Sequence, residues 1–449
     1  TNVGTLTITN SGGTTFSGAV SAGSLTITDS VASTAVTFNG DLTLTTGMTV
    51  SAGNAYNVAI NGTTNTIAGT TTFANTGTLA LGNGSDTINF TGGVIATAPS
   101  AVTVNGTVTA AGTGLITLGD SNTAVTIGGT STIGGTSTGQ ITTGAIALNN
   151  SLTVGATAAT PITLTTVTGP SSGSANLTIN TAGVVAVGGA VGTNVGTLTI
   201  TNSGGTTFSG TVAATTVTLT NTTGSIVFND ALTATTLNTA AQGYNVELNG
   251  STGTITNAVT FSNTGALALG ASGGTLTFNG GLTATAPSAS TLKGTITSSN
   301  DAMSFGPITL GANTTLNTVA TTNVADLSIG AVTGATYSLT LRTGAVSGAE
   351  ITGTSTSGVG TLTITNSGGT TFSGAVSAGS LTITDSAAST AVTFNGDLTL
   401  TTGMTVSAGT AAYNVAINGT TNTIAGATTF ANTGTLALGN GSDTINFTG

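Results

Sequence analysis

Apolar residues and threonines alternate along most of the chain. In residues 5–9, TLTIT, the leucine and isoleucine fall on one side of an extended strand and the threonines on the other, because side chains in a strand alternate. Such runs are separated by Gly, Asn and Ser clusters, for example NSGG at residues 10–13. These residue types favour turns. The pattern predicts an all-β chain with branched apolar side chains facing a core.

The longest repeated signal is VGTLTITNSGGTTFSG, which occurs three times, at residues 3–18, 195–210 and 359–374. The repeats extend into three copies: a first copy (3–99), a looser middle copy (195–287) and a third copy (359–449). Diverged segments separate them at 100–194 and 289–358. We interpret residues 1–449 as one continuous, elongated and uncapped array, a window of a longer one.

The phenylalanines confirm the alignment of the copies. Twelve of the thirteen occupy corresponding places, and three tyrosines (Tyr56, Tyr244 and Tyr413) do the same. We predict that these twelve form a structural core ladder: Phe16, Phe38, Phe73, Phe90, Phe208, Phe228, Phe261, Phe278, Phe372, Phe394, Phe430 and Phe447.

A shorter period lies inside each copy. LTIT at residues 6–9 returns at 25–28, and the phenylalanine spacings are close to one or two such steps. Coils of roughly 17–22 residues follow, within the range of short β-repeats. A β-sandwich does not explain near-identical copies, and the blades of a propeller are longer than these coils. A lipid-facing barrel needs aromatic girdles, which a chain with no tryptophan and four tyrosines cannot supply. The arithmetic therefore predicts a parallel β-helix, or β-solenoid, whose coils share one core.

Composition narrows the functional classes. With 38% apolar and 3% charged residues, the chain is predicted to fold rather than stay disordered. The chain has 12 acidic and only 2 basic residues, which gives a net charge of −10. Because it has no basic surface for a phosphate backbone, we exclude nucleic acid as a partner. The most apolar stretch, residues 182–192, is about half the roughly 20 residues of a membrane helix, so no transmembrane segment is expected. The absence of cysteine suits an exported protein.

The ionisable residues do not suggest an enzyme. There is no histidine or cysteine, the 12 acidic residues are scattered singly, and Lys293 and Arg342 are about fifty residues apart. General acid–base catalysis needs positioned titratable groups. We therefore predict no enzymatic activity, no catalytic residues and no cofactor-binding residues.

Two segments indicate calcium binding as an alternative. GNGSDTINF at residues 82–90 and 439–447 is similar to the calcium nonapeptide of β-rolls, which makes Asp86 and Asp443 candidate ligands. That motif needs tandem copies sharing an ion, and residues 269–276 of the middle copy contain no aspartate. The sequence favours a polar turn over a metal site.

Ice binding is another alternative, because stacked Thr-x-Thr pairs can order water. Such pairs occur at residues 43–45 and 218–220. Ice binding requires the pair at one fixed place in every coil, whereas the coil length varies and many outward positions are Ala, Gly, Ser or Asn. These features favour an ordinary solvated, β-favouring surface.

Residues 4–28, GTLTITNSGGTTFSGAVSAGSLTIT, resemble the passenger-associated repeat of autotransporters. More loosely, the chain is similar to filamentous haemagglutinin-like adhesins and other bacterial β-strand-repeat surface proteins. The resemblance implies a right-handed parallel β-helix that is exported to the cell surface as a stalk, adhesin or fibre. No translocation barrel, secretion signal or anchor is found within this sequence.

These observations predict a structural protein. We expect the repeat region of a bacterial cell-surface or extracellular fibre, sheath, surface layer or adhesin stalk, with ice-binding or calcium-dependent adhesion as alternatives. The expected partner is the chain itself, through end-to-end or lateral assembly. A host or neighbouring-cell surface, or glycans, are further candidate partners.

Overall fold

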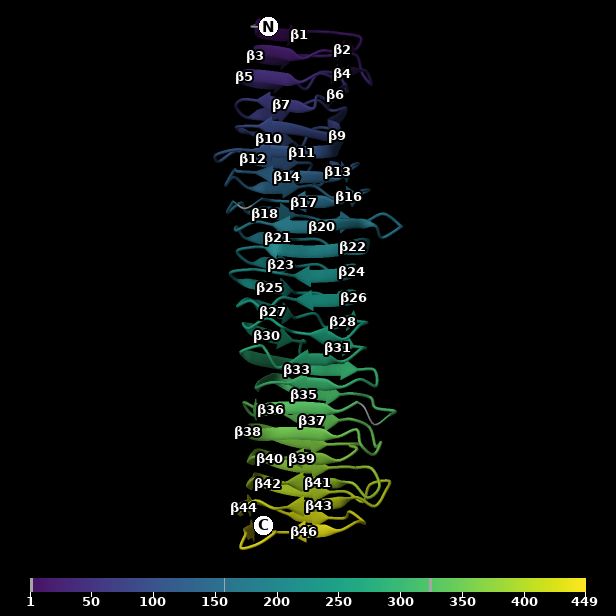
Figure 1. Cartoon of the computed structure of the whole chain (residues 1–449), viewed down its shortest axis with the longest axis vertical. Coiled ribbons are helices and arrows are strands. Elements are labelled where there is room, and N and C mark those ends of the chain that lie inside the picture. Colours follow the sequence, from purple (N-terminus) through teal and green to yellow (C-terminus); the bar gives the residue numbers. More distant parts are fainter. Residues whose placement is uncertain (1–2, 157, 323–324) are drawn as a thin grey trace. The chain divides into compact units, whose positions relative to one another are not determined.

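The computed structural model describes residues 3–156, 158–322 and 325–449 (Figure 1). Within them all regular structure is β, with no α-helix, and no helix there could cross a membrane. The chain forms two compact units, Thr1–Ile226 and Val227–Gly449. Each unit is a parallel β-solenoid in which strands pair in parallel with strands of the next coil. The predicted all-β solenoid class is confirmed, while the single continuous array stays a prediction.

The first unit contains twenty-four complete strands among its described residues. They are β1 (Val3–Ile8), β2 (Thr14–Phe16), β3 (Val20–Ile27), β4 (Ala35–Phe38), β5 (Leu42–Val50), β6 (Asn57–Ile60), β7 (Thr64–Ile67), β8 (Thr71–Phe73), β9 (Thr78–Phe90), β10 (Gly93–Ala96), β11 (Ala101–Ala110), β12 (Leu115–Leu118), β13 (Ala124–Ile127), β14 (Ser131–Gly135), β15 (Ile141–Thr143), β16 (Ile146–Leu148), β17 (Leu152–Val154), β18 (Ile162–Leu164), β19 (Val167–Thr168), β20 (Ala175–Asn180), β21 (Val185–Val187), β22 (Val191–Asn202), β23 (Thr206–Phe208) and β24 (Val212–Leu219).

Strand β25 (Ser225–Phe228) spans the limit between the units. The strands of the second unit are β26 (Leu232–Thr239), β27 (Asn245–Leu248), β28 (Thr252–Ile255), β29 (Val259–Thr260), β30 (Ala266–Leu269), β31 (Thr275–Phe278), β32 (Leu282–Ala284), β33 (Ala289–Ser298), β34 (Met303–Phe305), β35 (Ile308–Asn317), β36 (Leu327–Thr333), β37 (Leu339–Arg342), β38 (Ile351–Ile364), β39 (Thr370–Phe372), β40 (Val376–Ile383), β41 (Ala391–Phe394), β42 (Leu398–Val406), β43 (Asn414–Ile417), β44 (Thr421–Ile424), β45 (Thr428–Phe430), β46 (Leu436–Leu438) and β47 (Thr444–Phe447).

The number of residues between register partners in successive coils gives the coil length. In the first unit Leu6 pairs with Leu25, nineteen residues on, while β11 pairs with β14 at an offset of 25. In the second unit the offset ranges from 18, between β33 and β35, to 25, between β35 and β37. The coils therefore vary slightly more than the predicted 17–22 residues. A register slip by one residue would turn every apolar side chain outward, so added residues are confined to turns and bulges.

Burial follows the alternation seen in the sequence. In β11 buried and partly exposed residues alternate over all ten positions, and Val102, Val104 and Val108 are at most 1% exposed. The strand β33 in the second unit shows the same alternation. Each fully buried aliphatic side chain contributes about 1.5–3 kcal/mol relative to an exposed one. The core thus runs through the stacked coils of each unit, and each coil depends on its neighbours for burial.

The predicted NSGG turns are present in all three copies. The second glycine of each turn has φ between +110° and +138° (Gly13, Gly205 and Gly369), a conformation that side-chain-bearing residues rarely adopt. The serine of each turn also contacts a hydroxyl one coil further on. These Oγ–O distances are 2.9 Å, 2.8 Å and 2.9 Å for Ser11–Ser30, Ser203–Thr222 and Ser367–Ser386. The turns therefore stack on one another as the strands do.

Candidate functional site

The phenylalanines of the predicted ladder lie mostly in the core. Nine are at most 1% exposed: Phe38, Phe73, Phe90, Phe208, Phe228, Phe261, Phe278, Phe372 and Phe394. Phe16 and Phe430 are half-buried, and Phe447 is 39% exposed. Among the described residues, strands β2, β45 and β47, which carry these three, each pair with a strand on one side only. Their exposure therefore reflects a missing neighbour and not a different orientation.

The ring contacts repeat between copies. Phe16 stacks on Phe38 with ring centroids 5.1 Å apart, and Phe372 stacks on Phe394 at 5.7 Å. The second pair of each copy is edge-to-face, with centroid distances of 6.0–6.2 Å for Phe73–Phe90, Phe261–Phe278 and Phe430–Phe447. Both geometries are favourable for aromatic pairs. The phenylalanines are thus packing residues, and the ladder is discontinuous, since Phe38 is followed by Ile60 in the register.

The carboxylates that recur between copies stabilise turns. Asp29 accepts hydrogen bonds from the backbone N–H groups of Ser30 (2.8 Å) and Asn54 (2.7 Å). Asp385 accepts the corresponding bonds from Ser386 and Thr410. Among the described residues, no group of three or more Asp, Glu, His or Cys side chains could hold a metal ion.

The calcium candidates lie in different local structures: Asp86 is inside β9, next to a register shift with β11, whereas Asp443 is between β46 and β47. The Oδ2 of Asp86 accepts the N–H of Asn83 at 2.7 Å, and Asp443 accepts that of Asn440 at the same distance. Asp86 is 7% exposed, since Gly106 of β11 pairs with it. A turn is therefore present at Asp443 but not at Asp86, and a calcium role stays a prediction.

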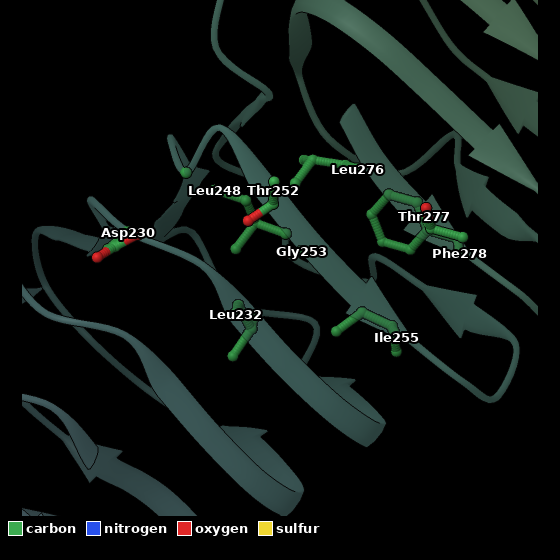
Figure 2. Close-up of a pocket in the computed structure, with 10 residues that line it drawn as sticks. Asp230, Leu232, Leu248, Thr252, Gly253, Ile255, Leu276, Thr277 and Phe278 are labelled. Atoms are coloured by element: carbon green, nitrogen blue, oxygen red, sulfur yellow. The ribbon is translucent and has the colours of Figure 1, made fainter. Parts of the chain in front are cut away.

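A small cavity of about 10 Å³ marks a difference between copies (Figure 2). Gly253 lines it where the first and third copies carry the buried Asn65 and Asn422. In the first copy, the Asn65 amide oxygen accepts the N–H of Leu42 at 3.0 Å, and its nitrogen donates to the carbonyl of Gly62 at 2.5 Å. The cavity is the size of one water molecule. It is a packing feature and not a substrate pocket.

Threonines form continuous columns on the outer surface of both units. Eight stacked positions in register in the first unit are Thr64, Thr87, Thr107, Thr132, Thr153, Thr178, Thr199 and Thr218. Nine in the second unit are Thr252, Thr275, Thr295, Thr315, Thr340, Thr363, Thr382, Thr405 and Thr429. None of these threonines is buried. The pattern is more regular than the sequence analysis expected.

The second column that a Thr-x-Thr face requires is interrupted. Beside the column of the second unit, Thr254, Thr277 and Thr297 are followed in register by Asn317 and then Arg342. A side chain as long as arginine breaks a flat hydroxyl lattice. The geometry therefore supplies one regular column and only a short second one.

Two surface grooves lie in different units. One, of about 500 Å³ in the first unit, is lined by glycines and threonines with Ile95, Ala111 and Leu115. The other, of about 440 Å³ in the second unit, is lined by hydroxyl and amide side chains with Tyr337, whose side chain is 40% exposed. Tyr337 was not among the residues predicted to have a role. The available signal was that this tyrosine alone has no counterpart in the repeats.

These features define the chain as a β-solenoid repeat protein. Comparisons with family models, curated proteins and solved structures find no match for it. Its functional assignment therefore depends on the geometry described above.

Proposed function

We propose that this chain is the structural repeat region of a bacterial cell-surface or extracellular protein, acting as a fibre, sheath, surface layer or adhesin stalk. The observation that carries the proposal is that near-identical copies in different units form equivalent strands and ring contacts. In a solenoid each coil contacts only its neighbours, so further copies add length without requiring a new fold. Such a design suits spacing and mechanical roles.

Self-association is part of this proposal. The chain carries 14 charged side chains among 449 residues, and its threonine columns present neutral, β-favouring surfaces. Little charge repulsion opposes the approach of two such surfaces. The partner is a second copy of the chain, and a host or neighbouring-cell surface is a further partner class.

Imaging tests the structural role most directly. We expect electron micrographs of the purified chain to show rods or an ordered assembly. Fibre diffraction should give a repeat of about 4.7–4.9 Å along the rod axis, the spacing of paired strands. Compact globules at every concentration, with no axial repeat, would contradict the proposal.

Charge placed on a threonine column tests lateral association. Thr132→Lys with Thr153→Lys should lower the assembled fraction in sedimentation velocity, because two ammonium groups repel on facing surfaces. Matched lysines at the exposed turn residues Ser121 and Ser171 are the control and should leave assembly unchanged. Equal effects of both pairs would show that the column is not the contact surface.

Ice binding is a second candidate, favoured by the continuous threonine columns. It predicts thermal hysteresis and faceted ice crystals, which the lysine pair in the column should abolish. The calcium-dependent alternative predicts that a chelator reduces the β signal in circular dichroism. Freezing without thermal hysteresis would contradict ice binding, and a spectrum that a chelator does not change would contradict calcium dependence. The structural role would then be the one that is left.

A further inference from the structure

The groove in the second unit that contains Tyr337 has the volume of a small-molecule site and a mainly polar lining. We call it the Tyr337 groove, and its volume of about 440 Å³ lies within the roughly 300–1,000 Å³ usual for ligand pockets. None of the described residues that line it is charged. They are Ser272, Gly273, Gly294, Thr295, Ala312, Asn313, Thr314, Thr315, Tyr337, Ser338 and Thr340.

Tyr337 lies in a coil that is longer than the two coils before it. Thr275, Thr295 and Thr315 follow one another in register at intervals of 20 residues, but Thr340 comes 25 residues after Thr315. Four of the five added residues lie between Asn317 and Leu327, because the offset is already 24 where Ile308 pairs with Val332. One added residue lies between β36 and β37, in the turn that carries Tyr337. The Tyr337 side chain is 40% exposed, so the ring lies at the surface and not inside the core.

The backbone of this turn is fixed before any ligand arrives. Ala335 and Thr336 have φ of 48° and 71°, which is unfavourable for residues with a Cβ and most of all for a β-branched one. The Tyr337 N–H donates to Gly334 at 2.9 Å, and its carbonyl accepts the N–H of Gly360 at 2.8 Å. A ligand thus meets a side chain on an ordered turn, which lowers the entropic cost of binding.

The floor of the groove is open because it carries small residues. Gly294 has φ of 69°, and a Cβ there would lie 2.4 Å from the carbonyl oxygen of Ala271. Gly273 and Ala312 are also small. No larger side chain can fill the floor at Gly294 without moving the backbone of the neighbouring coil.

Neutral hydrogen-bonding groups surround this floor. The Asn313 amide oxygen accepts the N–H of Ser338 at 3.0 Å, which orients the side chain and leaves its nitrogen as a donor. Thr295, Thr315 and Thr340 occupy the same position in successive coils. The coil spacing of roughly 4.8 Å is close to the length of one pyranose unit, so successive sugars can meet successive threonines.

We propose that the Tyr337 groove binds a neutral, extended oligosaccharide. The Tyr337 ring offers an apolar face to the C–H groups of one sugar ring, while the threonine, serine and asparagine side chains bond its hydroxyl groups. This activity goes beyond the structural role and does not depend on it. A charged polymer has no ion-pairing partner among the lining residues.

Calorimetric titration of the whole chain with a β-1,4-linked glucose hexamer tests the proposal. Saturable binding is expected, with Tyr337→Ala weakening it about tenfold, as loss of one aromatic contact predicts. Tyr337→Phe keeps the ring and should bind within a few-fold of the original chain. The curved α-1,4-linked hexamer should bind more weakly than the extended one.

Leu115→Ala is the matched control, because Leu115 is 47% exposed in the other groove, which has no aromatic residue. It should leave sugar binding unchanged, and circular dichroism should show that all variants fold. No saturable binding of either hexamer, or equal affinity for Tyr337→Ala, would overturn the proposal. A change in sedimentation on Tyr337→Ala without sugar binding would assign the groove to self-association instead.

Discussion

The first and third copies contain one identical segment in two different surroundings. TGTLALGNGSDTINFTG spans residues 76–92 and again 433–449. In the first copy Leu79, Leu81 and Phe90 are at most 1% exposed, because β11 pairs with their strand. In the third copy the equivalent Leu436, Leu438 and Phe447 are 40%, 47% and 39% exposed. The strand is also continuous in the first copy as β9 but divided into β46 and β47 in the third.

The difference shows which properties belong to a coil and which come from its neighbour. The sequence of the segment determines which residues point inward, and this is the same in both copies. Burial, strand length and shielding from water come from the next coil. The stability of such a chain is therefore close to a sum of coil and interface contributions.

The largest expected effect on stability comes from replacing Phe90 and its equivalent in the third copy, Phe447. Phe90→Ala should lower the local free energy of opening by about 3–5 kcal/mol, as for other fully buried phenylalanines. Phe447→Ala should cost less than about 2 kcal/mol, since much of that ring is already in water. Amide hydrogen exchange of the flanking strands measures each loss separately, because long repeat arrays need not unfold in one step.

An added coil is the control for this comparison. Appending a second copy of residues 93–118 after Gly449 should bury Phe447, and Phe447→Ala should then cost as much as Phe90→Ala. If the cost stays small after the addition, the neighbour-burial explanation is wrong.

A smaller effect is expected where the middle copy differs from the other two. Asn65→Gly removes three hydrogen bonds of a buried amide, to Leu42, Gly62 and Thr87, and should cost about 1–3 kcal/mol. Thermal unfolding together with hydrogen exchange of β5 measures the loss. Asn61→Gly, at a partly exposed residue between β6 and β7, is the control and should cost less.

The reverse change requires two substitutions. A Cβ on Gly253 would lie 3.0 Å from both the Leu232 carbonyl oxygen and Leu276 Cδ2. In the first copy Asn65 pairs with Ile88 in place of a leucine. Gly253→Asn alone should destabilise the coil, and Leu276→Ile should relieve the part of that loss that comes from the side-chain contact. The expected coupling energy is about 0.5–3 kcal/mol. Additive effects of the two changes would show that the side chains do not compete for this space.

The sequence predicted what depends on residue type and spacing. Alternation located the strands, and the correspondence of the phenylalanines identified nine fully buried rings. It could not predict the turn carrying Tyr337, because Ala335 and Thr336 adopt positive φ without the glycine or asparagine that would signal it. The threonine columns were also missed, since they depend on register between coils of unequal length.

The smallest expected effect concerns tyrosines that should behave alike in both copies. Tyr56 donates a hydrogen bond to the Ser51 carbonyl at 2.7 Å, and Tyr413 donates to that of Ser407. Burial, and secondarily the charge of Asp29 or Asp385, raises the pKa of each tyrosine to about 12. These partners belong to the same copy as the tyrosine. The neighbouring coil, which buries Phe90 but has no counterpart over Phe447, should therefore not affect the pKa of either tyrosine.

The sign of the pH dependence follows from the raised pKa. An unfolded tyrosine ionises near pH 10, while the folded one keeps its proton until about pH 12. Its contribution to stability is therefore complete below about pH 10 and is lost as the pH rises through about 12. Tyr56→Phe should cost about 0.5–1.5 kcal/mol at neutral pH and should flatten this alkaline loss, as should Tyr413→Phe. Unfolding midpoints measured against pH test both variants; an unchanged alkaline slope in either one would mean that other groups cause the loss.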